Sequence, residues 1–253
     1  MDFLIRTTDT VATERNILRI GLFLLVFIVS VPARALSVVL PPDINYTDLH
    51  KAADECDLVK GRAALDVLST ATKNEEINRL DRESYTPLAY AARGGCIEIV
   101  KLLIDKGAIA DAMDDHTRWT PLLQAADQRH AEVVRYLLAH GANINVKAGF
   151  GQTPLTAAIL GSVFSYGPKG DRDETVQALL VGGADVNLQG QFSWTPLMTA
   201  VLQGDADLAQ LLIGKGADLA AKDTKGKTAL DYAEERDERG IGDILKSRRE
   251  TTH

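Results

Sequence analysis

Side chains that could carry out chemistry are sparse in this 253-residue sequence and do not fall into catalytic spacings. Nucleophile, zinc and phosphate sites are recognised by patterns such as G-x-S-x-G, H-E-x-x-H, paired C-x-x-C and the Walker loop, and the sequence contains none of them. The five histidines are scattered along the chain: His50, His116, His130, His140 and His253. The sequence therefore predicts a protein that is not an enzyme and that needs no metal or cofactor.

Two short segments need a closer look. Asp114 and Asp115 are paired carboxylates; we expect solvated charges there, with a weak cation site as the alternative. The glycine-rich segment from Gly167 to Gly170 does not follow a strand and open a helix, which is what a phosphate-binding loop does. Neither segment predicts a reaction.

One short sequence motif, which we call the phrase, recurs along the chain and predicts where its helices begin. Thr-Pro-Leu followed by small residues begins at Thr86, Thr120, Thr153 and Thr195, with a degenerate copy at Thr228. These threonines are 34, 33, 42 and 33 residues apart. Thr can cap a helix, Pro suits the first helical turn, and Leu with small Ala residues forms a thin face that a neighbouring helix can approach. The phrase predicts the first helix of a repeated unit.

A second helix and a glycine stop follow the phrase. Apolar residues recur with helical spacing in residues 99–104, 133–138, 176–180 and 208–213. Gly107, Gly141, Gly183 and Gly216 then stand where the end of a helix favours a left-handed residue. Because the stops keep the spacing of the threonines, the chain is predicted to be a stack of helix-turn-helix units.

The period near 33 residues and the Thr-Pro-Leu phrase resemble the ankyrin repeat. The resemblance implies an all-α solenoid of about six units with projecting β-hairpin loops, with units starting near residues 47, 86, 120, 153, 195 and 228. The first unit is weaker because Asp48 replaces Pro, and the last is charged, as a terminal cap facing water should be. His50 stands where the family phrase often has His, which implies a structural hydrogen bond to the adjoining turn.

The unit that begins at Thr153 is longer than its neighbours. The extra residues fall between its two helices, in residues 161–173, which are rich in Gly and contain Pro. We expect a loop at one edge of the array, either a tolerated surface insertion or a partner contact.

The same resemblance assigns a binding role to one row of side chains. In ankyrin-like repeats the hairpin between two units projects as a finger, and the residue before the capping Thr, with those two or three earlier, faces the groove that partners use. Both Trp of this chain fall at such positions. We predict partner binding by Tyr85, Trp119, Phe150, Gln152, Phe192, Trp194 and Lys227. The alternative is that the rings pack between the fingers and stiffen them.

The two cysteines lie where the first helices of adjacent units end. Cys56 follows Thr47 and Cys96 follows Thr86 at nearly equal spacing. Helix axes pack about 8 to 10 Å apart, whereas a disulfide needs Cα atoms closer than about 7 Å. A bridge therefore requires the two turns to lean together, and two buried free thiols are the alternative.

Residues 1–35 have the pattern of a cleavable secretory signal, and residues 36–46 are expected to link it to the array at 47–253. Arg6, Arg15 and Arg19 precede an apolar stretch of about 12 residues, too short to span a bilayer comfortably, and Ala33 and Ala35 fit a signal-peptidase site. We expect an exported protein, periplasmic or secreted, with an N-terminal membrane anchor as the alternative.

The net charge and the predicted export limit the classes of partner that this chain can have. The formal net charge of −7 disfavours nucleic acid, because binding phosphates requires a basic surface. We expect a monomer that makes no membrane contact after signal cleavage. Because the ankyrin family is chiefly intracellular, a signal points to a bacterial envelope or periplasmic interaction module that scaffolds, protects or inhibits a protein partner. The alternative is a secreted effector that engages host proteins.

Overall fold

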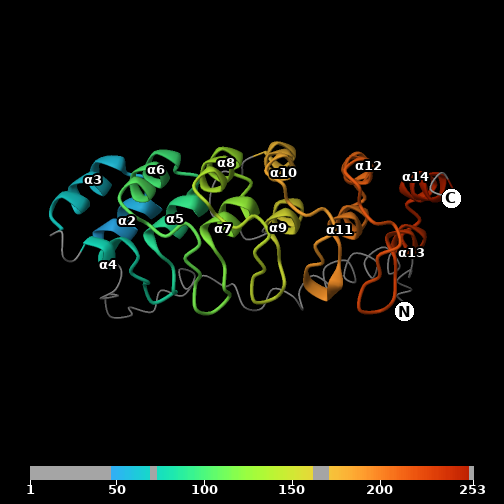
Figure 1. The fold of residues 1–253 in the computed structure, drawn as a ribbon, viewed down its shortest axis with the longest axis horizontal. Helices are drawn as coiled ribbons and strands as arrows, with labels where there is room; N and C mark the ends of the chain where they lie inside the picture. The colour runs from blue at the N-terminus through green and yellow to red at the C-terminus, as the bar shows by residue number, and fades with distance from the viewer. Residues whose placement is uncertain (1–46, 69–72, 162–170, 251–253) are drawn as a thin grey trace, which may run out of the picture. The chain divides into compact units, whose positions relative to one another are not determined.

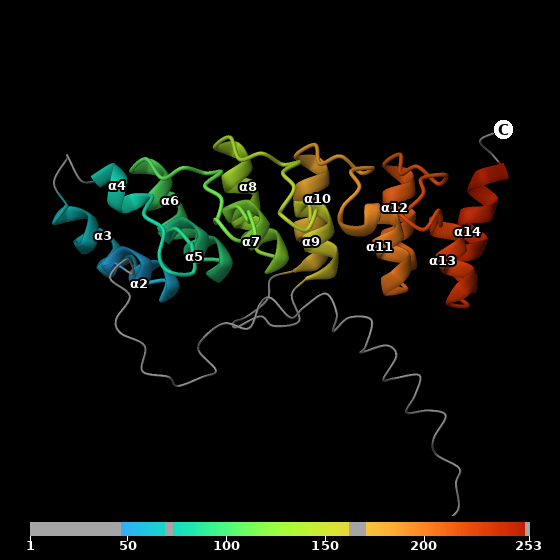
Figure 2. The same ribbon diagram turned by 90° about the horizontal axis from the view of Figure 1, so that it is seen from below.

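The computed structural model describes residues 47–68, 73–161 and 171–250, and these form helices stacked in two rows (Figure 1). The first row consists of α2 (Asp48–Asp54), α5 (Pro87–Gly94), α7 (Pro121–Asp127), α9 (Pro154–Leu160), α11 (Pro196–Gln203) and α13 (Ala229–Glu235). The second row consists of α3 (Leu58–Asp66), α6 (Ile97–Asp105), α8 (Ala131–Ala139), α10 (Arg172–Val181), α12 (Ala206–Gly214) and α14 (Arg239–Glu250). Each first-row helix packs on its neighbours in the row and on the second-row helix of its own unit (Figure 2). The predicted all-α solenoid is confirmed.

Every first-row helix begins at a threonine cap. The hydroxyls of Thr47, Thr86, Thr120, Thr153, Thr195 and Thr228 each accept a hydrogen bond from the backbone N–H three residues later. Four of these helices also have Pro in the first turn. The recurring phrase thus sets where each unit starts, as the sequence predicts.

The second-row helices of four units end at the predicted glycines. Gly107, Gly141, Gly183 and Gly216 have φ between 87° and 100°, a left-handed conformation that disfavours any side chain. The backbone turns there and leads into the loop that joins the next unit.

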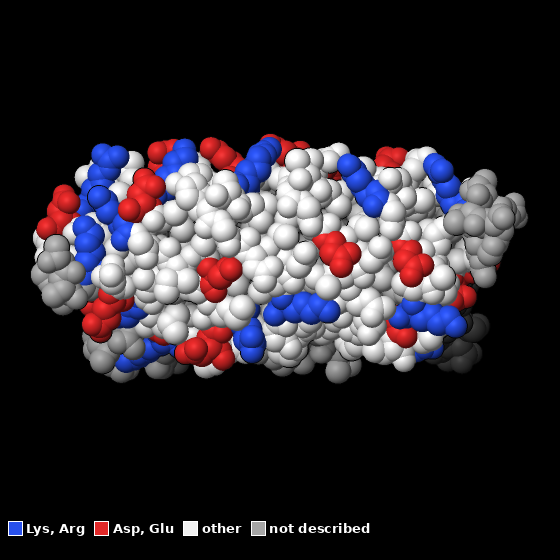
Figure 3. Space-filling model, viewed as in Figure 1, with Lys and Arg blue, Asp and Glu red and all other residues white. Residues whose placement is uncertain are grey.

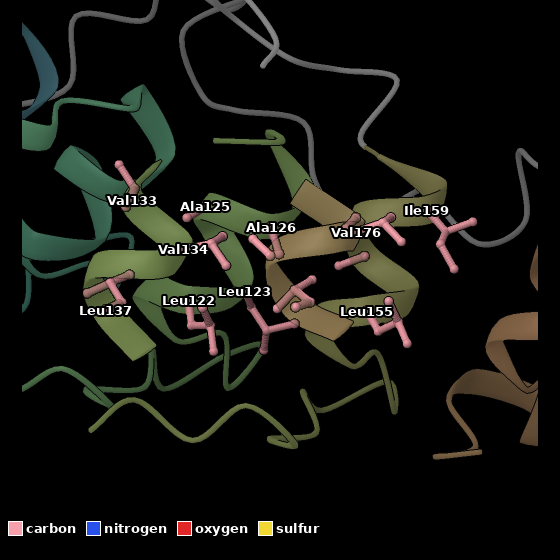
Figure 4. Close-up of a cluster of buried hydrophobic side chains, with 14 of the residues drawn as sticks. Leu122, Leu123, Ala125, Ala126, Val133, Val134, Leu137, Leu155, Ile159 and Val176 are labelled. Atoms are coloured by element: carbon pink, nitrogen blue, oxygen red, sulfur yellow. The ribbon is translucent and has the colours of Figure 1, made fainter. Parts of the chain in front are cut away.

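Small and aliphatic side chains fill the space between the rows. In the middle of the array, Ala125 and Ala126 of α7 face Val134 of α8, and Leu155 of α9 continues the same layer (Figure 4). These side chains are at most 2 % exposed. Alanine keeps the helices of neighbouring units close, so each unit is stabilised chiefly by the units on either side.

Side chains also tie one unit to the next. Asn78, Asn145 and Asn187 each accept a hydrogen bond, through a side-chain oxygen, from a backbone N–H of the following unit at 2.7 to 2.9 Å. Arg129 donates to the carbonyls of Ala158, Ile159 and Leu160 at 3.2 to 3.3 Å, which satisfies the C-terminal end of α9. Such bonds fix the stacking register between units.

The structure differs from the predicted elements in three places. In the first unit a short α4 (Lys73–Ile77), which the sequence did not indicate, follows α3. The expected β-hairpins are loops, since the described residues contain no strand. Arg172 and Asp173 belong to α10 rather than to the loop assigned to the insertion.

Some predicted segments lie outside the described residues. These are the signal at 1–35, the linker at 36–46 and residues 162–170 of the insertion. Within the part of the chain that is described, no helix has both the length and the apolar character needed to cross a bilayer.

Candidate protein-binding surface

Five loops project below the first row of helices in Figure 1, and we call them the first to fifth fingers. They comprise residues 81–85, 114–119, 148–152, 190–194 and 223–227. In each finger the backbone N–H of the first residue donates to the carbonyl of the last at 2.8 to 3.0 Å. The residue before the last has a positive φ in all five: Ser84, Arg118, Gly151, Ser193 and Gly226. A left-handed residue at this place closes a short loop as it does in a compact hairpin turn.

Buried aspartates organise three of the fingers. Asp81, Asp114 and Asp223 begin the first, second and fifth fingers and are 5 to 7 % exposed. The Asp114 carboxylate accepts hydrogen bonds from the backbone N–H groups of His116 and Trp119 at 3.0 and 2.9 Å. The expectation that Asp114 is a solvated charge is therefore wrong, because its oxygens are used to fold its own finger.

Tyr85, at the end of the first finger, is half-buried. Its ring meets the edge of the Tyr90 ring at a centroid distance of 5.5 Å, and the Arg93 guanidinium lies 5.5 Å from the Tyr85 centroid. The Tyr90 hydroxyl donates to Asp81 at 2.7 Å. Burial raises the pKa of Tyr85, and burial together with the hydrogen bond to Asp81 raises the pKa of Tyr90. Both phenols are neutral members of a packed cluster.

Trp194, at the end of the fourth finger, is likewise anchored. Its indole N–H points at a carboxylate oxygen of Asp223 at 3.3 Å and at the Tyr232 hydroxyl at 3.2 Å. The Tyr232 hydroxyl donates to Asp223 at 2.5 Å, and burial together with that bond raises the pKa of Tyr232 to about 12. Lys227 pairs with Glu235 at 2.6 Å and lies 5.4 Å from the Tyr232 ring centroid. Trp194 and Lys227 are thus held by one cluster.

The second and third fingers complete the row. Trp119 is half-buried and packs on the apolar core, as Tyr85 and Trp194 do. Gln152 is half-buried, and its carbonyl closes the third finger. The three rings that precede capping threonines therefore support the fingers, which matches the alternative role considered for them. Their part in binding stays a prediction.

Phe150 and Phe192 differ from the rest of the predicted set. They are 51 % and 46 % exposed, and the other five predicted residues are half-buried. The Phe192 ring contacts the Trp194 ring at a centroid distance of 5.5 Å, and Phe192 itself has a φ of 57°. A bulky residue in a left-handed conformation costs about 1 kcal/mol or more, so its exposed position is one that the fold enforces.

Backbone contacts join the second to fifth fingers. The N–H of Gly149 donates to the carbonyl of Thr117 at 2.6 Å, and the N–H of Thr224 donates to the carbonyl of Phe192 at 3.1 Å. The third and fourth fingers approach so closely that a Cβ atom on Gly190 would lie 3.2 Å from the carbonyl oxygen of Gly151. The fingers therefore form a continuous layer that presents Phe150 and Phe192 on adjoining loops.

The rings of His50 and His130 contact backbone carbonyl groups. The Nε2 atom of His50 lies 3.0 and 3.1 Å from the carbonyl oxygens of Arg79 and Tyr85, which confirms the expected bond to the adjoining turn. His130 contacts the carbonyl of Arg93 at 3.1 Å, and burial lowers the pKa of His130. Within the described residues, no three His, Cys, Asp or Glu side chains form a group that could hold a metal ion.

Cys56 and Cys96 are joined by a disulfide in the structure. Their Cα atoms are 5.3 Å apart, because the turns that end α2 and α5 lean together. Cys56 is exposed and has a φ of 56°, whereas Cys96 is 7 % exposed. The bridge links the first unit to the second.

Charged side chains are interspersed on the face shown in Figure 3. Lys, Arg, Asp and Glu side chains gather along its upper edge, over the second row of helices, and the middle of the face is mostly uncharged. In the lower middle, where the fingers project, Lys and Arg side chains lie on a mostly uncharged surface, with separate Asp or Glu side chains above them and to their left. A continuous basic surface of the kind that binds nucleic acid is not what this face presents.

Two sets of residues that shape the surface went unnoticed in the sequence. Asp81 and Asp223 each stand five residues before a capping threonine, a spacing that could have identified them as organisers of the fingers. Arg129 reaches the end of a helix in the next unit, and the sequence carries no signal for that contact.

Comparison with known proteins identifies the family. The family model for ankyrin repeats (3 copies) matches residues 49–148, 110–165 and 165–250, which cover the array almost completely. The chain belongs to the ankyrin-repeat family. The repeats of this family are protein–protein interaction modules, and no enzyme family was found.

Curated relatives match parts of the chain. The B-cell lymphoma 3 protein homolog of Mus musculus is 32 % identical over 112 residues, which are 44 % of this chain and 25 % of that protein. Ankyrin repeat and SAM domain-containing protein 6 of Mus musculus is 36 % identical over 84 residues, 33 % of this chain and 10 % of that protein. Rabankyrin-5 of Homo sapiens is 31 % identical over 120 residues, 45 % of this chain and 10 % of that protein. The chain thus spans a quarter or less of these relatives.

Proposed function

We propose that this chain is a non-catalytic module whose protein partner contacts the row of fingers. The observation that carries the proposal is the exposure of Phe150 and Phe192 on adjoining loops that backbone contacts hold together. Aromatic side chains held in place bind with little loss of entropy, and exposed apolar groups gathered on one edge mark interaction sites. Tyr85, Trp119 and Trp194 contribute mainly by holding the fingers in position.

We propose further that the module acts outside the cytoplasm, in a bacterial envelope or periplasm, where it scaffolds, protects or inhibits its partner. The signal pattern of residues 1–35 supports this proposal. The bridge between Cys56 and Cys96 also supports it, because disulfides persist in oxidising compartments.

The second candidate is a secreted effector that engages host proteins. It is favoured by the resemblance of the repeats to those of animal proteins such as Rabankyrin-5. The two candidates differ in where the mature protein accumulates, so one fractionation experiment distinguishes them.

The location is tested by expressing the whole chain in a bacterium and measuring the intact mass of the protein in each fraction. We expect a periplasmic protein that begins at Leu36. A mass that includes residues 20–31 in the membrane fraction supports the anchor instead, protein in the medium supports the effector, and uncleaved protein in the cytoplasm contradicts export.

The binding surface is tested by site-specific photocrosslinking in cells that make the protein. A photoreactive side chain replaces Phe150 in one variant and Val181, which is 80 % exposed on α10, in the control. We expect a discrete protein adduct from position 150 that position 181 does not give. Equal adducts from both positions, or none from position 150, would refute binding through the fingers.

A further inference from the structure

The composition of the fingers changes along the array. The position three residues before the capping threonine holds Glu83 in the first finger, Phe150 and Phe192 in the third and fourth, and Lys225 in the fifth. All four side chains are exposed. Because the N–H of Thr224 donates to the carbonyl of Phe192, Lys225 lies on the loop that adjoins Phe192. The apolar part of the row is therefore bordered by positive charge on its C-terminal side.

More cations lie close to the two phenylalanines in the chain. Lys147 precedes the third finger and Lys222 precedes the fifth, and both are exposed. Among the described residues, neither of them nor Lys225 has a carboxylate within ion-pair distance. Lys227, by contrast, is paired with Glu235. Three lysines at the third to fifth fingers are thus available to a partner.

The neighbouring carboxylates offset these cations only in part. The pKa of Asp231 is lowered chiefly by hydrogen bonds from Thr228 and further by the charges of Lys222 and Lys227, so Lys222 shares its field with that carboxylate. Asp223 is buried, and its oxygens accept hydrogen bonds from the backbone of Lys225 and Lys227 at 2.8 Å. The third and fourth fingers contain no acidic residue. The surface beside the two exposed rings thus carries more positive charge than the chain as a whole, whose formal net charge is −7.

We infer that the fingers bind an acidic segment of a partner protein, in which apolar side chains contact Phe150 and Phe192 and carboxylates pair with Lys147, Lys222 and Lys225. This inference rests on the proposed function and specifies the chemistry of the partner. The rings supply buried apolar area, and the lysines select and orient an anionic segment over a neutral or basic one.

Aromatic rings beside lysines are also the elements of a single-stranded nucleic acid site. An acidic protein segment is favoured because a nucleic acid strand spreads its charge along its whole length. The first and second fingers, which such a strand would reach next, hold exposed charges of both signs, Arg82 with Glu83 and Asp115 with Arg118, so they do not extend the positive surface. A nucleic acid is accordingly one of the probes.

The experiment measures fluorescence anisotropy with the purified full-length array and four labelled probes. The first is a peptide of repeating Glu-Glu-Leu-Phe; the second has Lys in place of each Glu; the third has Gly-Ser in place of each Leu-Phe; the fourth is oligo-dT. We expect the first peptide to bind at least about tenfold more tightly than each of the others. Its affinity should fall as salt rises from about 50 to 500 mM.

Variants assign the effect to the fingers. The double change Phe150→Ala with Phe192→Ala should weaken binding of the first peptide at least about tenfold, and Lys147→Glu with Lys225→Glu should reverse the preference toward the basic peptide. Val181→Ala and Lys106→Glu, which alter exposed residues outside the fingers, are the matched controls and should change the affinity less than about twofold. Thermal melting of each variant shows that the array is folded.

Several results would overturn the inference. They are equal affinity for the acidic and basic peptides, no measurable binding of any peptide, tighter binding of oligo-dT, and self-association of the array that the two Phe changes abolish. If finger crosslinks still capture a protein whose bound segment is basic or uncharged, the proposed function survives and the acidic partner does not.

Discussion

Replacing Trp194 separates support of the fingers from direct binding. Truncating a buried aromatic side chain to Ala costs about 3 to 5 kcal/mol of unfolding free energy. Trp194 is half-buried on the core, so we expect Trp194→Ala to lower the unfolding free energy by about 3 kcal/mol, the low end of that range. Trp194→Phe keeps most of the packing but loses the N–H that points at Asp223 and Tyr232, and should cost about 1 kcal/mol.

Phe192 is the matched control for Trp194, because it lies in the same finger and is 46 % exposed. Phe192→Ala should cost only about half a kcal/mol, which is the value of its contact with the Trp194 ring. Urea unfolding of the three variants gives the free energies, and anisotropy with the acidic peptide gives the affinities. The reasoning is refuted if Trp194→Ala costs less than about 1 kcal/mol, or if Phe192→Ala proves the more destabilising change.

Three further predictions concern stability alone. A disulfide that closes a loop with a sequence separation of 40 stabilises the folded protein by about 4 kcal/mol. The double change Cys56→Ala with Cys96→Ala should therefore remove hydrogen-exchange protection from α2 and α3 first. Two free thiols in the denatured, unreduced exported protein would contradict the bridge. Arg118 has a φ of 58° and is exposed, so Arg118→Gly should raise the urea midpoint, whereas Gly226→Ala at a φ of 76° should lower it; the same sign for both would contradict the left-handed assignment. Burial lowers the pKa of His130, so the unfolded chain takes up a proton below about pH 6.5 that the folded protein does not. The contribution of His130 to the unfolding free energy should therefore be complete above that pH and fall on acidification. The change His130→Gln should reduce the loss of unfolding free energy between pH values of about 7.5 and 5.5.

The sequence predicted the fold well because the repeat states the same local rule several times. Each threonine cap and each glycine stop is decided by residues within one turn of a helix, and the 33-residue spacing confirms the reading by repetition. The first unit was read less accurately, because Asp48 replaces Pro and the start of α3 depends on Asp57, which caps it from a position outside the phrase. Local signals place elements where the phrase is intact.

The candidate site was harder to predict because burial depends on neighbouring fingers. Trp119 and Phe150 both precede a capping threonine closely, yet one packs on the core and the other is exposed. Trp119 follows the left-handed Arg118 and is the last residue of its finger, whereas Phe150 precedes the left-handed Gly151, and the sequence does not show on which side of that turn a ring packs. The sequence thus predicted where the fingers lie, but only the structure shows which aromatic rings pack on the core and which are exposed.

The covalent link between the first two units makes the two ends of the array mechanically unlike. A chain of units that contact only their neighbours can be dismantled from either end, one unit after another. The bond from Cys56 to Cys96 closes that route at the N-terminal end, whereas α14 at the other end is held by non-covalent packing alone. A protease or translocase that pulls on the C-terminus will therefore unfold the last units early, together with the fifth finger and its lysines. It will reach the first two units, which the disulfide joins, last. Loss of the basic end of the row will precede loss of the fold.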